Sequence, residues 1–293
     1  MNLKRAIYAL VMGALIISFS GVWVKLSHTP PSVSGFYRVF FGWLFLIFFC
    51  LIKKELYQWH EKQNFLAVVC GLLFALDLWA WHSSIAYIGP GLATILGNCQ
   101  VFVLSVTGFL VFKERVHSAF ILSVPLAFTG LFLMIGIDME HIGDQQIKGI
   151  FFGILAAVFY SMFLLLLRKL QAEDKSFSLF YYLMAISFSA SIFLGVFAIA
   201  SGQSLAIPDR SALFSLICLG LFSQTVGGVM ITNSLPKVRA SLAGLILLLQ
   251  PAFSFVWDVI FFKRVTGIAG WTGVILVLAA IYWGMGKKTE SLK

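Results

Sequence analysis

Residues 90–116, PGLATILGNCQVFVLSVTGFLVFKERV, align with residues 240–265, ASLAGLILLLQPAFSFVWDVIFFKRV. Both stretches have a Leu-Ala pair near the start, a glutamine at equivalent depth (Gln100 and Gln250) and a Phe-Lys pair near the end. One residue is deleted opposite Glu114. A match of this length predicts that the chain contains an internal duplication.

The composition indicates that this duplicated chain lies in a lipid bilayer. Of its residues, 60% are hydrophobic and only 11% are charged, whereas charged residues make up about a quarter of a typical soluble domain. A helix that spans a bilayer needs about 20 apolar residues, and segments with Pro and Gly separate such stretches here. The sequence predicts ten spans, at residues 6–26, 33–52, 65–88, 91–112, 118–137, 148–168, 177–200, 211–234, 240–262 and 268–286.

A second, shorter match supports the duplication, because SGFYR at 34–38 lines up with SLFYY at 178–182. The single membrane domain, 1–293, therefore divides into a first five-helix repeat at 1–140 and a second at 141–293. Since five is odd, the two halves must enter the membrane with opposite orientations. The predicted fold is an all-α polytopic membrane protein of ten transmembrane helices, arranged as two inverted five-helix repeats. Transporters often have this plan, with the substrate site at the repeat interface near the midplane.

Ten spans as five plus five, a Gly-Pro-Gly turn before LATILGNCQVF, and FKER at the end of the fourth span resemble the EamA-type transporters of the drug/metabolite transporter superfamily. The resemblance implies alternating access by a basket of helices, with the fifth helix of each half at the periphery. It also implies an acid where the fourth helix of each half ends. Glu114 fills that position in the first half, but the second half has Lys263 and Arg264 and lacks the acid.

The basic residues predict the orientation of the chain. With the N-terminus in the cytoplasm, 15 of the 21 Lys and Arg residues fall in cytoplasmic segments, the side that positive charge favours. Both termini are therefore predicted to be cytoplasmic, in a multi-pass protein of the inner (cytoplasmic) membrane. Lys263 and Arg264 are exceptions on the outer side. The net charge of +9 follows from this bias, so no nucleic acid is predicted as a partner.

The stretch DLWAWHSSIAY, at residues 77–87, places an acid in the middle of the third span. A charge at the bilayer centre costs about 2.5–3.5 kcal/mol on insertion scales, so Asp77 needs a partner, a proton or water. Helical spacing puts Asp77 and Trp81 on one face, where they are predicted to bind a cationic or planar group. The alternative is a structural acid paired with a neighbouring helix. His82, off this face, either titrates in the site or is neutral and bonded to a neighbouring helix.

Polar residues of other spans complete the predicted substrate site, namely Asn98, Gln100, Tyr160, Gln224 and Gln250. An amide is uncharged and can both donate and accept hydrogen bonds. The alternative for these amides is that they only hold helices together. Pro251 lacks a backbone N–H, so the ninth span is predicted to kink there.

Two charged residues near span ends are assigned other roles. Arg38 lies about one turn inside the outer end of the second span and is predicted to extend its side chain to the membrane interface, although an inward reach to Asp77 is possible. Asp258 is predicted to be a solvated or salt-bridged gate residue near Lys263. The motif GIFFG at 149–153 is predicted to pack within the molecule rather than to make a dimer.

Several chemistries have no support in the sequence. There is no GxxxxGK[ST] phosphate-binding loop for ATP, and no HExxH or GxSxG motif. The five histidines are scattered, so no catalytic site, metal site or cofactor is predicted. The expected partners are a small-molecule metabolite and the lipid bilayer, with the protein a monomer or a weak dimer.

The sequence thus predicts a secondary transporter, not an enzyme. It would move a small organic metabolite of the amino acid or heteroaromatic type by alternating access, with export as the commoner direction in the resembling family and with possible proton coupling through Asp77 or His82. Two alternatives remain open, a membrane-embedded enzyme that modifies a lipid, and a channel or lipid-binding protein.

Overall fold

The structure is a computed structural model that describes residues 2–55, 61–114, 117–135, 144–173 and 178–285. Every regular element in these residues is a helix, which confirms the predicted all-α class. The helices are α1 (Leu3–Ser18), α2 (Ser20–Leu26), α3 (Pro31–Ile52), α4 (Glu61–Gly97), α5 (Gln100–Leu110), α6 (Ser118–Ile135), α7 (Asp144–Glu173), α8 (Leu179–Ala200), α9 (Arg210–Cys218), the π-helix η1 (Leu219–Gly227), α10 (Gly228–Ser234), the short 3₁₀-helix η2 (Leu235–Lys237), α11 (Ala240–Leu247), α12 (Leu249–Phe262) and α13 (Ile268–Met285).

Nine stretches of the described chain are helical, long and apolar enough to cross a bilayer. The predicted span at 118–137 corresponds to α6, whose apolar part, Ser118–Met134, is shorter, and residues 136–143 lie outside the described residues. The nine stretches are Leu3–Leu26, Pro31–Ile52, Glu61–Ile88, Leu92–Leu110, Asp144–Ala172, Leu179–Ala200, Arg210–Lys237, Ala240–Phe262 and Ile268–Met285.

Large apolar side chains cover the outside of the bundle. Phe109, Phe151 and Val196 are among many that are mostly exposed. Soluble proteins rarely expose contiguous apolar patches on this scale, whereas lipid tails solvate such side chains. The surface therefore agrees with a multi-pass membrane protein.

The chain turns back on itself within α4. In a straight helix, at 1.5 Å per residue, Trp81 and Gly97 would lie about 24 Å apart. Instead, a methyl group on Gly97 would lie 3.6 Å from Cδ1 of Trp81, and the side chains of Ser84 and Leu96 both lie against Gly153. The reversal falls at the Gly-Pro-Gly segment, which was predicted to separate the third and fourth spans.

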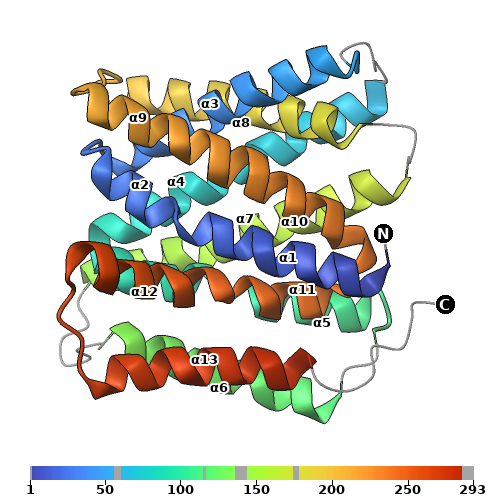
Figure 1. The fold of residues 1–293 in the computed structure, drawn as a ribbon, viewed down its shortest axis with the longest axis vertical. Helices are drawn as coiled ribbons and strands as arrows, with labels where there is room; N and C mark the ends of the chain where they lie inside the picture. The colour runs from blue at the N-terminus through green and yellow to red at the C-terminus, as the bar shows by residue number, and fades with distance from the viewer. Residues whose placement is uncertain (1, 56–60, 115–116, 136–143, 174–177, 286–293) are drawn as a thin grey trace.

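Figure 1 shows the helices stacked in layers. The layer of α3, α8 and α9 lies on one side, the pair α6 and α13 lies on the other, and the remaining helices lie between them. The beginning of α1 and the end of α13 point toward the same end of the bundle. We call this end, with Leu3 and Met285, the termini face, and the opposite end, with Leu26 and Phe262, the far face.

Specific helix pairs hold the layers together. The most extensive contacts join α4 to α7, α6 to α13 and α3 to α8, followed by α4 to α8, α3 to η1 and α5 to α11. Small residues allow these close approaches. A methyl group on Gly130 would lie 2.6 Å from the backbone oxygen of Gly273, and one on Gly273 would lie 2.4 Å from that of Gly130. The GIFFG motif packs against α4 through Gly149 and Gly153, within the molecule as predicted.

Three spans are interrupted partway through the bundle. The first span breaks at Phe19 between α1 and α2, the fourth at residues 98–99 between α4 and α5, and the ninth at Leu248 between α11 and α12. Pro251 has no N–H to donate to the carbonyl of Leu247, so the ninth span is interrupted where the proline predicts. Broken spans of this kind are a recurring way to build a site inside a membrane protein.

We predict that Gly273→Ala separates α6 from α13 and lowers thermal stability in detergent, because overpacking of a tight interface typically costs about 1–3 kcal/mol. The matched control is Gly21→Ala, since a methyl group on Gly21 meets nothing within 4 Å. Differential scanning fluorimetry should show a loss of several degrees for the first variant and none for the second. Equal melting temperatures for both variants and the parent would contradict the packing described.

Candidate functional site

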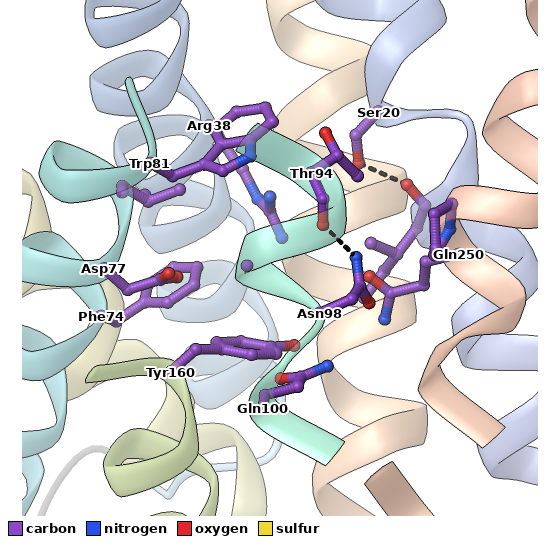
Figure 2. Close-up of a pocket in the computed structure, with 14 residues that line it drawn as sticks. Ser20, Arg38, Phe74, Asp77, Trp81, Thr94, Asn98, Gln100, Tyr160 and Gln250 are labelled. Atoms are coloured by element: carbon purple, nitrogen blue, oxygen red, sulfur yellow. Dashed lines mark hydrogen bonds between the residues drawn. The ribbon is translucent and has the colours of Figure 1, made fainter. Parts of the chain in front are cut away.

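A cavity of about 190 Å³ lies where the broken spans meet. Figure 2 shows Phe74, Asp77 and Trp81 on one side of it, Ser20 and Gln250 on the other, and Asn98 between them. Its lining residues lie near the middle of their spans or nearer the far face, so the cavity extends from mid-depth toward the far face. They are Ile17, Ser20, Arg38, Phe74, Asp77, Leu78, Trp81, Thr94, Gly97, Asn98, Gln100, Tyr160, Gln250 and Pro251.

The structure brings most of the predicted site residues together in this one cavity. Those that line it come from the third, fourth, sixth and ninth spans, and they are Asp77, Trp81, Asn98, Gln100, Tyr160 and Gln250. The helical face that carries Asp77 and Trp81 continues to Ser84, one turn further along, but only its first part lines the cavity. Asp77 and Trp81 face the cavity, whereas Ser84 donates to the backbone oxygen of Gly149 at 2.8 Å. A role in binding stays a prediction for all six lining residues.

Two predicted residues lie beside the cavity. Gln224 lines a smaller pocket of about 40 Å³ that shares Arg38, Phe74 and Tyr160 with the cavity. His82 is not among the residues lining either pocket. Its ring packs against Gly35, and its Nδ1 is buried without a hydrogen-bond partner.

Arg38 faces the cavity, which corrects the prediction that it extends to the membrane interface. Its Nε donates to Oε1 of Gln224 at 3.3 Å, and its guanidinium carbon lies 5.5 Å from the centre of the Phe74 ring. Arg38 is seven residues from Pro31, the first residue of α3, and thus about 10 Å inside the span. From this depth the guanidinium is far from the lipid head groups, whereas a hydrogen-bond acceptor, Oε1 of Gln224, lies beside it inside the bundle.

The π-helix η1 positions the acceptor for Arg38. The hydroxyl of Thr225 donates to the backbone oxygen of Gly220, five residues earlier, at 3.0 Å. Nε2 of Gln224 in turn donates to Oγ of Ser187 at 3.0 Å, which fixes the orientation of the amide. Short π-helical segments occur frequently at functional sites. No local pattern in the sequence predicts this one.

The two charged residues of the cavity wall are not directly paired. Asp77 interacts electrostatically with Arg38 and Tyr160, but no ion pair joins Asp77 to Arg38 within the described part of the chain. An acid and a base therefore face one cavity with no ion pair between them. Such groups need a partner, a proton or water, because hydrocarbon cannot solvate their charged forms.

Amide groups at mid-depth leave further bonding capacity open. Oε1 of Gln100 is buried and has no hydrogen-bond partner. The Gln250 side chain interacts with Tyr160, while Asn98 donates to the backbone oxygen of Thr94 at 2.8 Å. Buried polar atoms are nearly always bonded, so the unpaired oxygen of Gln100 marks a place for water or a bound molecule.

Tight helix packing lies between the cavity and the termini face. All residues of α11, Ala240–Leu247, are buried. Gly244 lets α11 approach α5 closely, because a methyl group there would lie 3.2 Å from Cα of Val101. The fourth and ninth spans thus make a tight contact on this side of the cavity.

Asp258 is salt-bridged as predicted but has different partners. Its carboxylate lies 2.7 Å from Nζ of Lys25 and 3.9 Å from a guanidinium nitrogen of Arg264. Lys263, the predicted neighbour, instead takes a left-handed backbone conformation with φ of 51°. Across the residues that the structure describes, no group of three or more His, Cys, Asp or Glu side chains could hold a metal.

A sequence model of the EamA-like transporter family matches the chain twice, at residues 4–136 and 147–285. The chain belongs to this family. It is thereby a member of the drug/metabolite transporter superfamily, in agreement with the resemblance of its repeated motifs.

The relatives of this EamA-like transporter carry transporter names. It is 24% identical to human solute carrier family 35 member G1, over 92% of this chain and 76% of the relative. It is also 24% identical to the uncharacterized inner membrane transporter YhbE of Escherichia coli, over 96% and 89%. An uncharacterized transporter of Archaeoglobus fulgidus is 22% identical over 93% of both chains. These names indicate no catalytic function, which points away from the lipid-modifying enzyme.

The architecture of the EamA-like transporter also occurs in a solved structure. A crystal structure of another protein superposes with a TM-score of 0.82 and covers 96% of this chain and 98% of its own, at 13% sequence identity. At that identity the likeness concerns the fold alone.

We predict that the cavity admits water-soluble reagents. In a variant of this EamA-like transporter whose four native cysteines are replaced by alanine, Asn98→Cys should react with a small cationic thiol reagent. Ser84→Cys, at a fully buried position near the far end of the third span, is the control. Because thiol reactivity follows access to the thiolate, the rates should differ by about tenfold or more. Similar rates, or no reaction at position 98, would show that the cavity is dry.

Proposed function

We propose that this EamA-like transporter carries a small zwitterionic metabolite, of the amino acid or heteroaromatic type, across the cytoplasmic membrane by alternating access. One observation carries the proposal, namely that a base, Arg38, and an acid, Asp77, face the same cavity with no ion pair between them. A zwitterion supplies a carboxylate for the guanidinium and an ammonium for the carboxylate, so its binding neutralises both charges.

The geometry of Arg38 favours a carboxylate ligand. Its Nε is used by Gln224, which leaves the two terminal nitrogens of the guanidinium for the cavity. Two parallel N–H donors match the two oxygens of a carboxylate. Gln224 and Ser187 hold the guanidinium in place, so less side-chain freedom is lost when a ligand binds.

Aromatic side chains favour a planar or apolar group on the same cargo. Phe74, Trp81 and Tyr160 all line the cavity, and Phe74 and Tyr160 each pair with Phe163, at ring-centre distances of 4.9 and 5.9 Å. Rings held in this way offer faces for stacking and for cation–π contact. The unpaired amide oxygen of Gln100 is available for a heteroatom of the cargo.

Alternating access by two inverted repeats is supported by the pattern of helix contacts. The third span packs on the sixth as α4 on α7, and the eighth packs on the first as η1 and α10 on α1. Equivalent spans also pair with each other, as α3 with α8, α5 with α11 and α6 with α13. These contacts are unchanged when the two halves are exchanged, and the family model matches each half separately.

The direction and coupling are proposed from charge. The excess of Lys and Arg at the termini face supports a cytoplasmic location for both termini, so that the cavity extends toward the outside. Export of the cargo is the proposed direction. Asp77, in the cavity wall, is the proposed carrier of a coupled proton, whereas His82 lies off the cavity lining.

We predict that each charge of the cavity recognises one charge of the cargo. Tryptophan should bind to the purified parent protein, and Arg38→Met should weaken this binding by about 10- to 100-fold, since hydrogen bonds to charged groups are worth about 1.5–3 kcal/mol. Tryptamine, which lacks the carboxylate, should bind equally weakly to both proteins. Asp77→Asn should likewise weaken the binding of tryptophan, because the amide cannot pair with its ammonium. The same variant should leave the binding of indole-3-propionate, which lacks the amine, unchanged.

Thermal shift and isothermal titration calorimetry measure these affinities. A loss of tryptophan and tryptamine binding by the same factor in Arg38→Met would mean that Arg38 acts on the fold rather than on the carboxylate. Failure of tryptophan, smaller amino acids and heteroaromatic acids to bind the parent protein would overturn the zwitterion assignment.

We further predict that Asp77→Asn abolishes transport driven by a pH gradient in reconstituted vesicles, while exchange of labelled for unlabelled cargo continues at cargo concentrations raised to offset the weaker binding. An amide cannot release a proton, but it preserves the shape of the side chain. Coupling through Asp77 is wrong if the variant keeps both the flux and its dependence on pH.

A further inference from the structure

Glu114 connects two spans that are distant in sequence. Its carboxylate accepts hydrogen bonds from the backbone N–H groups of Ala240 (2.7 Å) and Ser241 (3.2 Å), and from the hydroxyl of Ser241 (2.7 Å). These groups begin α11, so the negative charge meets the positive end of the helix dipole. On α7, a guanidinium nitrogen of Arg168 lies 3.7 Å from the same carboxylate. We call Glu114, Arg168 and Ser241 the termini-face latch.

A specific turn after α5 presents Glu114 to α11. Lys113 has a left-handed backbone, with φ of 51°, and the N–H of Glu114 bonds to the backbone oxygen of Gly108 at 2.9 Å. The absence of a side chain at Gly108 makes room for the acid, because a methyl group there would lie 2.6 Å from Oε2 of Glu114.

The ninth span ends in the same kind of turn. Lys263 is left-handed with the same φ of 51°, and the N–H of Arg264 bonds to the backbone oxygen of Asp258 at 3.4 Å. Arg264 therefore occupies the place of Glu114, which corrects the alignment that left Glu114 opposite a deletion. By the same equivalence, Asp258 occupies the place of Gly108.

The equivalence of the two turns draws attention to Asp258, an acid near the end of the fourth span of the second half. At the far face, Asp258 contacts Lys25 at 2.7 Å, and we call these two residues the far-face pair. Lys25 is near the end of the first span, and Arg168 is near the end of the sixth. In both cases, a base from the first span of one half meets an acid from the fourth span of the other half.

The two contacts differ in their exposure to solvent. The side chains of Arg168 and Glu114 are 12% and 1% exposed, whereas those of Lys25 and Asp258 are 50% and 24% exposed. Exposed pairs are screened and contribute little, while a buried carboxylate with several charge-assisted bonds is held strongly. The more buried contact lies at the termini face, where the fourth and ninth spans pack tightly.

We propose that the termini-face latch holds the carrier closed on that side, and that the far-face pair is its counterpart when the cavity turns to the other side. The proposal rests on the alternating access proposed above. Opening the termini face requires the Glu114 carboxylate to leave the N-terminus of α11, and closing the far face buries Asp258 with Lys25. Glu114, Arg168 and Ser241 then set which side of the membrane the cargo site faces, without touching the cargo.

The test measures cysteine accessibility in the full-length protein in detergent, where both faces can be reached and no cargo is needed. Leu104→Cys, buried between the cavity and the latch, reports opening of the termini face, and Asn98→Cys reports opening of the far face. Since labelling follows the population of each open form, Glu114→Gln should raise the rate at position 104 about tenfold and lower the rate at position 98. Ser241→Ala should shift both rates in the same directions by a smaller factor.

Two controls make the result specific. Glu61→Gln removes one acid from the exposed start of α4 at the same face and should change neither rate. Asp258→Asn should leave the rate at position 104 unchanged or lower.

An unchanged rate at position 104 in both Glu114→Gln and Ser241→Ala would overturn the latch, whether or not the protein is a carrier. Faster labelling at both positions would show that Glu114 only stabilises the fold, which also overturns it. A shift with no measurable cargo flux would support the latch and count against the proposed transport.

Discussion

Charged side chains inside the bilayer impose the constraint on which the rest of this structure depends. Arg38 and Asp77 lie well within spans of the bundle, where hydrocarbon can neither solvate them nor screen them. The protein accommodates them around one cavity and anchors Arg38 through Gln224 and Ser187. The interrupted spans follow from the same requirement, because backbone groups freed at a break must face protein or water rather than lipid.

The breaks and the charges are arranged by duplication, yet the two halves are chemically unequal. The fourth and ninth spans break at nearly equivalent depth and end in the same left-handed lysine turn. An acid follows the turn in one half, and an arginine follows it in the other. Exchange of the halves therefore preserves the helix contacts but not the electrostatics, so two conformations related by that exchange differ in energy.

The sequence predicted the features that depend on residues close together along the chain. Apolar stretches gave the spans, Pro251 gave the break in the ninth span, and helical spacing placed Asp77 and Trp81 on one wall. Arg38 was assigned to the interface because its acceptor, Gln224, is 186 residues away and no local pattern links the two. His82 was grouped with Asp77 by proximity in sequence, although the helix turns it toward Gly35. Phe74 was overlooked, although its spacing of three residues from Asp77 and seven from Trp81 places it on the same helical face.

The π-helical η1 has one further implication for how the eighth span can move. A π-helix accommodates an additional residue within a helix, and an α-helix advances about 100° per residue. If the extra residue were absorbed into ordinary α-helical winding, one end of the span would rotate relative to the other by roughly that angle. Gln224 would then swing away from Arg38, and the guanidinium would lose its anchor. A change of winding in one membrane helix is thus coupled directly to the charge that faces the cavity.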